Sequence, residues 1–186
     1  MKGLGWITPW IALGAAFVLA GCPGLDEGGD GGTGDAGAAD GGGNQTCYPY
    51  VLVLDRESGG GNGVDLDSVA VYAPGMTLVG FADELHEVTL GPGQDVTCQD
   101  GNSALGAADD TAVCLGGSDG AIVLSFAART CIEQGDTIEV TELGLEGEPY
   151  DVMVGVTPGL SDPNWVLCAS AATGLAQCVV PVLPQL

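Results

Sequence analysis

Basic residues are almost missing from this sequence of 186 residues. Lys and Arg together number three, against 25 Asp and Glu, and the formal net charge is −22. Lys2, Arg56 and Arg129 are the only cationic side chains. Proteins that bind nucleic acid need a basic surface to neutralise phosphates. The composition therefore excludes nucleic-acid binding, and it also excludes electrostatic attraction to anionic lipid.

The familiar catalytic and zinc-binding motifs are missing too. His86 is the single histidine, no CxxC pair occurs, and neither GxSxG nor GxxxxGK[ST] is present. Zinc sites need closely spaced ligand pairs, and the two glycine motifs serve nucleophilic serines and phosphates respectively. We therefore interpret His86 as a surface histidine and predict that the chain is not an enzyme. Hydrolysis by paired carboxylates, with Asp136, Glu139 and Glu142 as candidates, is the remaining catalytic alternative.

What is present begins with an uncharged apolar run over residues 3–21, directly after Lys2. A short charged start, an apolar middle and small residues at the end are typical of a secretory signal peptide. The run is at the lower limit of the roughly 20 residues that a transmembrane helix needs.

The run ends in Leu19-Ala20-Gly21-Cys22, which resembles the lipobox of bacterial lipoproteins at all four positions. The resemblance implies that residues 1–21 are removed and that Cys22 carries the lipid that attaches the protein to the membrane. Pro23 stands where some lipoproteins have an inner-membrane retention aspartate, which favours the outer membrane of a bacterial cell envelope. A plain signal peptide or an uncleaved anchor is the alternative to a lipoprotein signal peptide.

Residues 22–46 comprise the predicted lipidated cysteine and a Gly/Asp-rich segment with no large apolar residue after Leu25. Such a composition cannot bury enough surface to offset its ordering entropy, so we expect a disordered tether. Calcium binding by its aspartates is not favoured, because calcium-binding repeats carry an apolar residue in each turn. From residue 47 to residue 186, Val, Leu and Ile return, and 140 residues suit one domain.

Six cysteines remain for this domain if Cys22 carries lipid, and an exported domain with six cysteines is expected to form up to three disulfides. Fifteen pairings are open. Loop length favours two local bridges, and these leave a third pair. The predicted bridges are Cys98–Cys114, Cys168–Cys178 and Cys47–Cys131.

Ten short apolar runs rich in β-branched residues recur between Gly, Pro, Asn and Asp. Alternation is clear where Val69 and Val71 share a face, and again where Val152, Val154 and Val156 do, which indicates strands. The one helical turn we expect lies at 81–86. The pattern predicts an antiparallel, jelly-roll-like β-sandwich stapled by disulfides. The expected strands are 50–55, 66–73, 77–82, 87–90, 111–115, 121–126, 137–141, 150–156, 164–169 and 177–182.

Several stretches together resemble the discoidin-like, galactose-binding-like β-sandwich modules of bacterial cell-surface lipoproteins. They are GVDLDSVAVY (63–72), ALGAADD (104–110), CLGGSDGAIVLSF (114–126), GDTIEVTE (135–142), EPYDVMVGV (148–156) and WVLC (165–168). The resemblance implies the sandwich fold, and with it binding of a carbohydrate or of calcium. The strand with DLDSV comes first here, whereas in those modules it comes last, which implies a permuted topology.

Asp55, Asp65 and Asp67 are the candidate calcium ligands. Two aspartates spaced i, i+2 on a strand share a face, and the glycines at 59–63 permit a turn that presents carbonyl oxygens, which calcium prefers. The alternative is an acidic loop that merely solvates a hairpin. Trp165 is the candidate aromatic residue for a sugar, and its alternative is a place in the core.

The sequence therefore predicts a lipid-anchored surface module that binds a ligand or mediates adhesion. The ligand would be a carbohydrate or a protein, with calcium as a structural ion. The alternative is a structural envelope lipoprotein that interacts only with other proteins.

Overall fold

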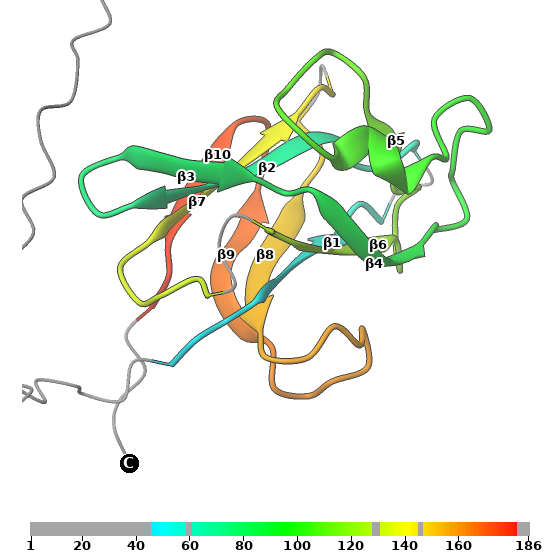
Figure 1. The fold of residues 1–186 in the computed structure, drawn as a ribbon. Helices are drawn as coiled ribbons and strands as arrows, with labels where there is room; N and C mark the ends of the chain where they lie inside the picture. Colours follow the sequence, from blue (N-terminus) through cyan, green and yellow to red (C-terminus); the bar gives the residue numbers. More distant parts are fainter. Residues whose placement is uncertain (1–45, 59–60, 128–130, 145–146, 182–186) are drawn as a thin grey trace, which may run out of the picture. The chain divides into compact units, whose positions relative to one another are not determined.

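The computed structural model describes residues 46–58, 61–127, 131–144 and 147–181. These residues form two antiparallel sheets packed on one another (Figure 1). The first sheet has the order β4 (Glu84–Thr89), β6 (Ala121–Ser125), β1 (Tyr50–Asp55), β8 (Tyr150–Gly155) and β9 (Val166–Ala172). The second has the order β10 (Ala176–Val179), β7 (Thr137–Glu142), β2 (Asp65–Ala73) and β3 (Thr77–Phe81), and β5 (Val113–Cys114) also pairs with β2. The predicted all-β sandwich is confirmed.

The main core lies between the two sheets and follows the alternation of the strands. Val69 and Val71 of β2 are fully buried in it, as are Val152 and Val154 of β8, so the predicted shared faces are confirmed for these four. Val156 lies just beyond β8 and is 49% exposed, so its place on that face was wrong. Each buried valine contributes about 1.5–3 kcal/mol, which makes this period-two pattern the main determinant of the fold.

The predicted helical turn at 81–86 is wrong. That stretch enters β4, an edge strand that pairs with β6 through Glu84↔Ser125 and the residues that follow. The ladder with β6 satisfies backbone groups that a helical turn too short to propagate would leave open. The described helical element is instead the 3-10 turn η1 (Gly101–Ala104), whose first turn is capped by the Asp100 side chain.

Three disulfides join the predicted pairs, the two local bridges Cys98–Cys114 and Cys168–Cys178 and the remaining pair Cys47–Cys131. Their Cα–Cα distances are 5.3, 5.7 and 4.9 Å, in the order given. The second of them ties β9 of the first sheet to β10 of the second. A bridge that closes a loop of about 15 residues stabilises the fold by roughly 3 kcal/mol.

The outer face of the first sheet carries a second, smaller apolar cluster. Along β1 the inward residues are core valines, whereas Tyr50, Leu52 and Leu54 alternate with them on the outer side. Leu160 and Trp165, from the loop 156–165 between β8 and β9, pack on this cluster. The loop 156–165 (orange in Figure 1) therefore covers part of the outer face, and we call this loop the roof.

Two hydrogen bonds fix this roof. The backbone N–H of Leu160 donates to the Glu87 carboxylate of β4 at 3.1 Å, so the loop reaches the far edge of the sheet. The indole N–H of Trp165 donates to the Gly159 carbonyl at 3.1 Å within the loop itself. The middle of the roof is thus held to β4, and its end at Trp165 is held to Gly159.

Candidate functional site

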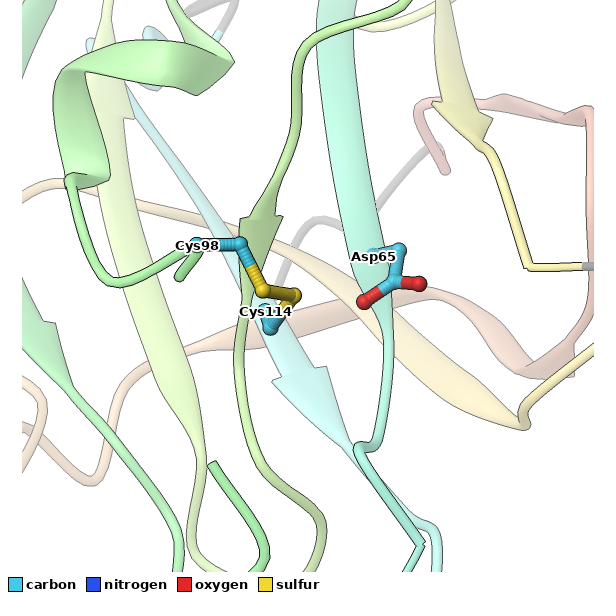
Figure 2. Close-up of side chains that lie close together, drawn as sticks. All are labelled: Asp65, Cys98 and Cys114. Atoms are coloured by element: carbon cyan, nitrogen blue, oxygen red, sulfur yellow. A yellow bond between two sulfur atoms is a disulfide. The ribbon is translucent and has the colours of Figure 1, made fainter. Parts of the chain in front are cut away.

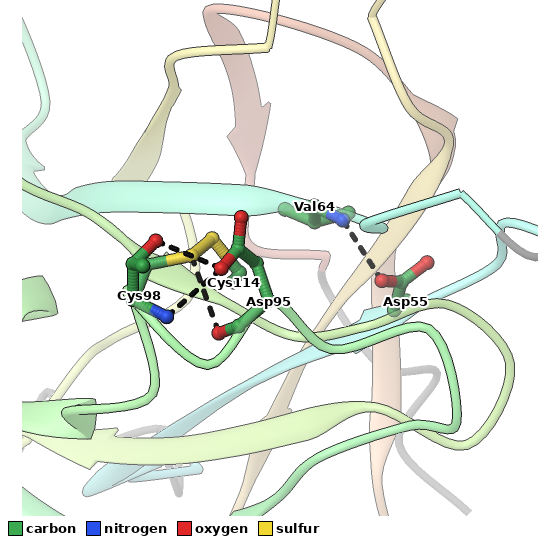
Figure 3. The surroundings of a disulfide bond; sticks show 6 residues. Asp55, Val64, Asp95, Cys98 and Cys114 are labelled. Carbon is green, nitrogen blue, oxygen red and sulfur yellow. Dashed lines mark hydrogen bonds between the residues drawn. A yellow bond between two sulfur atoms is a disulfide. The ribbon is translucent and has the colours of Figure 1, made fainter.

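Asp55 is a structural carboxylate that joins three chain segments. Its side chain is 2% exposed. Oδ2 accepts from the N–H groups of Val64 (2.8 Å, Figure 3) and Gly117 (2.9 Å), and Oδ1 accepts from the N–H of Glu57 (2.8 Å). Both oxygens are thus occupied by the protein. The role predicted for Asp55 as a calcium ligand has no support in this arrangement.

The glycines around Asp55 allow the backbone to approach it. Gly63 has φ of +69°, and a Cβ there would lie 2.1 Å from Asp55 Oδ2 and from Gly117 N. Gly117 itself has φ of +84°. Only glycine fits both the left-handed conformation and this spacing. Gly63 and Gly117 therefore permit close backbone packing, and N–H groups rather than carbonyls are aimed at Asp55.

Asp65 and Asp67 lie in different surroundings, so the three predicted calcium ligands are not brought together. Asp65 lies beside the disulfide Cys98–Cys114 (Figure 2), and Asp67, 1% exposed, accepts from the N–H of Asp109 at 3.2 Å. Each retains one buried oxygen that has no hydrogen-bond partner. A calcium site at these residues stays a prediction for which the structure assembles no ligand set.

Asp65, Cys98 and Cys114 form the one set of three potential ligand side chains within 4.8 Å of one another in the described part of the chain (Figure 2). Both sulfurs are consumed by the disulfide, so neither is a thiolate able to bind a metal. Burial, followed by the charges of Glu148, Asp95 and Asp55, raises the pKa of Asp65. These three residues are therefore a structural disulfide with acidic side chains around it.

Each of the three candidate hydrolase carboxylates is already hydrogen-bonded within the protein. Glu139 accepts from the Tyr72 hydroxyl at 3.0 Å, whereas Asp136 is buried and accepts from the N–H of Glu133 at 2.8 Å. Glu142, 7% exposed, accepts from two backbone N–H groups and lies beside Glu148, since both carboxylates border Gly144.

Burial and then the neighbouring Glu148 raise the pKa of Glu142 to about 7. The backbone N–H groups that bond Glu142 belong to Gly144 and Gly174. This close carboxyl pair therefore has a buried, structural setting rather than a cleft.

A hollow of about 310 Å³ lies on the outer face of the first sheet, beside edge strand β4. Its polar groups come from Glu84 and His86 of β4 and from Ser125 of β6, and the ring of Tyr50 in β1 forms part of the wall. The antiparallel register places Ser125 opposite both Glu84 and Tyr50, which explains why these side chains meet. The complete lining is Pro49, Tyr50, Glu84, His86, Ser125, Phe126 and Ala127.

The polar groups of the hollow form one hydrogen-bonded network. Ser125 Oγ lies 2.8 Å from His86 Nε2 and donates to Glu84 Oε2 at 3.1 Å, and Nε2 lies 3.6 Å from the same carboxylate oxygen. The ring of Tyr50 meets the imidazole edge-to-face, with 4.9 Å between centroids. The side chain of Glu84 is 63% exposed and that of His86 is 21% exposed. Ser125 therefore holds Glu84 and His86 in place from the sheet, while the Glu84 carboxylate remains open to solvent.

This network does not have the geometry of a nucleophilic triad. Because the hydroxyl proton of Ser125 points to Glu84, its oxygen accepts from Nε2 and the imidazole is not placed to remove that proton. The carboxylate faces Nε2, whereas a catalytic triad holds the opposite ring nitrogen. The nearby N–H of Ala127 already donates to Asp83 at 2.7 Å, so it cannot serve an oxyanion.

The structure places Trp165 next to the hollow but not in its lining. Its ring covers Gly155, where a Cβ would lie 2.5 Å from ring carbons, and Gly155 pairs with Tyr50. Trp165 is half-buried against the outer cluster. Its packing on the outer cluster is closer to the alternative, a place in an apolar core, and its role toward a sugar stays a prediction.

Sequence reasoning missed Glu84 and Ser125, and it treated His86 as an ordinary surface residue. A signal was present, because residues i and i+2 of the stretch ELHE share one face if it is a strand. The expected helical turn at 81–86 concealed that signal. Ser125 could be connected to the pair only through the register of β4 with β6.

No protein-family model matches this chain, and neither a curated protein nor a solved structure matches it. The predicted signal peptide, Cys22 and the tether lie outside the described residues. Within the described residues, no helix has the length and apolar character needed to span a membrane. The hollow is accordingly interpreted from its own residues.

Proposed function

We propose that this chain is a lipid-anchored protein of the bacterial cell envelope whose β-sandwich binds a carbohydrate in the hollow beside β4. The observation that carries the proposal is the convergence of Glu84, His86 and Ser125 on one hollow walled by the ring of Tyr50. Ligand sites characteristically combine an apolar lining with a few convergent polar groups. This hollow has that composition.

Neutral, hydroxyl-rich ligands suit these groups. The exposed carboxylate of Glu84 accepts hydrogen bonds from hydroxyls, Nδ1 of His86 is an acceptor when Nε2 carries the ring proton, and an aromatic ring packs against C–H faces. An anionic ligand would be repelled by Glu84 and by the 20 acidic residues found between 47 and 186. Arg56, the one described arginine, is already paired with Asp151 at 2.5 Å.

Anchoring through Cys22 rests on the sequence of residues 19–22. Each lipid methylene contributes about 0.8 kcal/mol, so several acyl chains on one cysteine hold firmly. A Gly-rich chain with the length of the Gly/Asp tether is expected to span roughly 25 Å on average, enough to separate the domain from the headgroups. Metabolic labelling with a palmitate analogue should label the wild type, and Cys22→Ser should abolish the label and release the protein. A labelled, membrane-bound Cys22→Ser protein would contradict this part of the proposal.

Binding is tested on the oxidised chain from Pro23 onward by calorimetric titration with neutral monosaccharides, with a primary amine as the charged comparison. We expect saturable binding of a sugar, and at least a tenfold loss with Glu84→Gln. Asp119→Asn is the matched control, because it removes the same charge outside the lining and Asn tolerates the φ of +74° found there. Its affinity should be unchanged.

Absence of sugar binding, or binding that is insensitive to Glu84→Gln, would reject the carbohydrate ligand. That result would favour the structural alternative, an envelope lipoprotein whose partners are other proteins. Tighter binding of the amine than of every sugar would instead indicate that the hollow binds cationic ligands.

A further inference from the structure

We infer that the carbohydrate is an oligomer that extends from the hollow across Tyr50 to a second aromatic subsite at Trp165. This inference rests on the proposed function, because it assigns a second unit to a ligand whose first unit occupies the hollow. It follows from the register of four strands, the placement of the Trp165 ring, and the roof formed by loop 156–165.

The register aligns the relevant residues in one row across the sheet. Glu84 pairs with Ser125, Ser125 pairs with Tyr50, and Tyr50 pairs with Gly155. Neighbouring strands are about 4.8 Å apart, so three steps from β4 to β8 span roughly 14 Å. A single sugar ring in the hollow would leave the β8 end of this row uncovered.

Trp165 stands at the β8 end of this row. Its ring lies on Gly155, the position of the row where the absence of a side chain leaves room for it. The indole N–H is held by the Gly159 carbonyl at 3.1 Å, so the orientation of the ring is set before any ligand arrives. A partly exposed aromatic residue whose ring is held in a fixed orientation is a low-entropy platform for a C–H face of a sugar.

The roof restricts the direction in which a ligand can extend. It covers the next row of the outer face, where Leu52 is 4% exposed and Val123 is fully buried. The bond from Leu160 to Glu87 holds it across to β4. A chain that leaves the hollow is therefore directed along the row from Ser125 past Tyr50, rather than over the apolar cluster.

The chain supplies its own reporter for this subsite. The three tryptophans of the sequence are Trp6, Trp10 and Trp165, so Trp165 is the only one after Cys22. Emission excited at a wavelength that tryptophan absorbs and tyrosine does not therefore reports on Trp165 alone in the oxidised chain from Pro23 onward. The titration compares glucose with cellotetraose, galactose with galactotetraose, and mannose with mannotetraose.

We expect one tetrasaccharide to bind at least fivefold more tightly than its monosaccharide, and only the tetrasaccharide to change the Trp165 emission. Trp165→Leu should reduce the tetrasaccharide affinity to that of the monosaccharide and leave the monosaccharide affinity unchanged. Calorimetric titration measures both affinities. Trp165→Phe, which keeps a ring and the packing on Gly155, should retain most of the gain. Glu84→Gln should weaken both ligands.

The outcomes separate the two proposals. If a monosaccharide binds but its tetrasaccharide gains nothing, or if the gain survives Trp165→Leu in a variant with unchanged melting temperature, the second subsite is rejected and the hollow stands. If neither ligand binds, the proposed function and this inference fail together.

Discussion

Two acidic regions of this domain use the same chemical group in opposite ways. Around Asp55, a carboxylate that is almost fully buried receives three backbone N–H groups from glycine-rich segments. On the outer face of the first sheet, the carboxylate of Glu84 is 63% exposed and accepts one hydroxyl from below. The difference indicates that the first carboxylate organises the fold, whereas the second retains hydrogen-bonding capacity that faces solvent.

Burial and occupied oxygens thus separate structural acids from candidate binding acids. The formal charge does not, because the sequence has 25 acidic residues and most of them resemble one another in local composition. The contrast is testable, since substitutions near Asp55 should change stability and a substitution of Glu84 should change binding.

The largest effect is expected for Gly63→Ala. The new Cβ would meet Asp55 Oδ2 and Gly117 N at 2.1 Å, and residue 63 has φ of +69°, so clash and strain act together. We expect a loss of about 3–5 kcal/mol in the free energy of unfolding, measured by urea titration.

Gly75→Ala is the matched control for Gly63→Ala. Gly75 has φ of +87°, but a Cβ added there would have no other atom within 4 Å. The variant should therefore lose only the conformational cost of about 1–2 kcal/mol. Equal losses at the two positions would show that the contact with Asp55 is unimportant.

Asp55→Asn should have the next largest effect. The amide group of Asn replaces one acceptor oxygen by a donor, which leaves at least one of the buried N–H groups of Val64, Gly117 and Glu57 facing another donor. We expect a loss of about 2–3 kcal/mol in the free energy of unfolding. The loss should be the same with calcium or with a chelator. A loss that appears only when calcium is present would restore Asp55 as a metal ligand.

The sandwich was predictable because period-two alternation of apolar residues directly encodes which face of a strand is buried. β1 was predicted at its observed bounds, and each of the ten predicted runs overlaps an observed strand. The hollow was not predictable in this way. It depends on the register between β4 and β6, which are separated by 31 residues of loop and short elements, and on an edge strand that has little apolar patterning of its own.

The same physical reason explains the errors on the aspartates. Asp65 and Asp67 look equivalent at i and i+2, but a register shift between Leu66 and Ser68 interrupts the pairing of β2 with β7. Leu66 and Val69, three residues apart, both enter the core. A bulge of this kind changes the surroundings of neighbouring side chains, and sequence alternation alone does not locate it.

Glu142 is intermediate between the two regions, because it is buried but has a second carboxyl group, Glu148, as a partner. Its pKa is raised to about 7, first by burial, and lies above the 4.5 of the unfolded chain. A raised pKa stabilises the fold fully below about pH 4.5, and this contribution is lost as the pH rises through 7. We expect the melting temperature to fall between pH 5 and pH 8.

Glu142→Gln should flatten this part of the profile, because a neutral amide cannot ionise. Relative to the wild type, the variant should gain stability as the pH rises from 5 to 8. Thermal melts of both proteins in matched buffers measure this difference. Parallel profiles for the two proteins would assign the pH dependence to other groups.

The smallest effect on stability is expected for Glu84→Gln. The Gln carbonyl oxygen still accepts from Ser125, the side chain is mostly exposed, and the backbone pairing of β4 is untouched. The free energy of unfolding should change by no more than about 0.5 kcal/mol. Binding of a sugar should nevertheless weaken, because a charge-assisted acceptor is roughly twice as strong as a neutral one. A large loss of stability would instead make Glu84 a structural acid like Asp55, and the distinction between the two regions would fail.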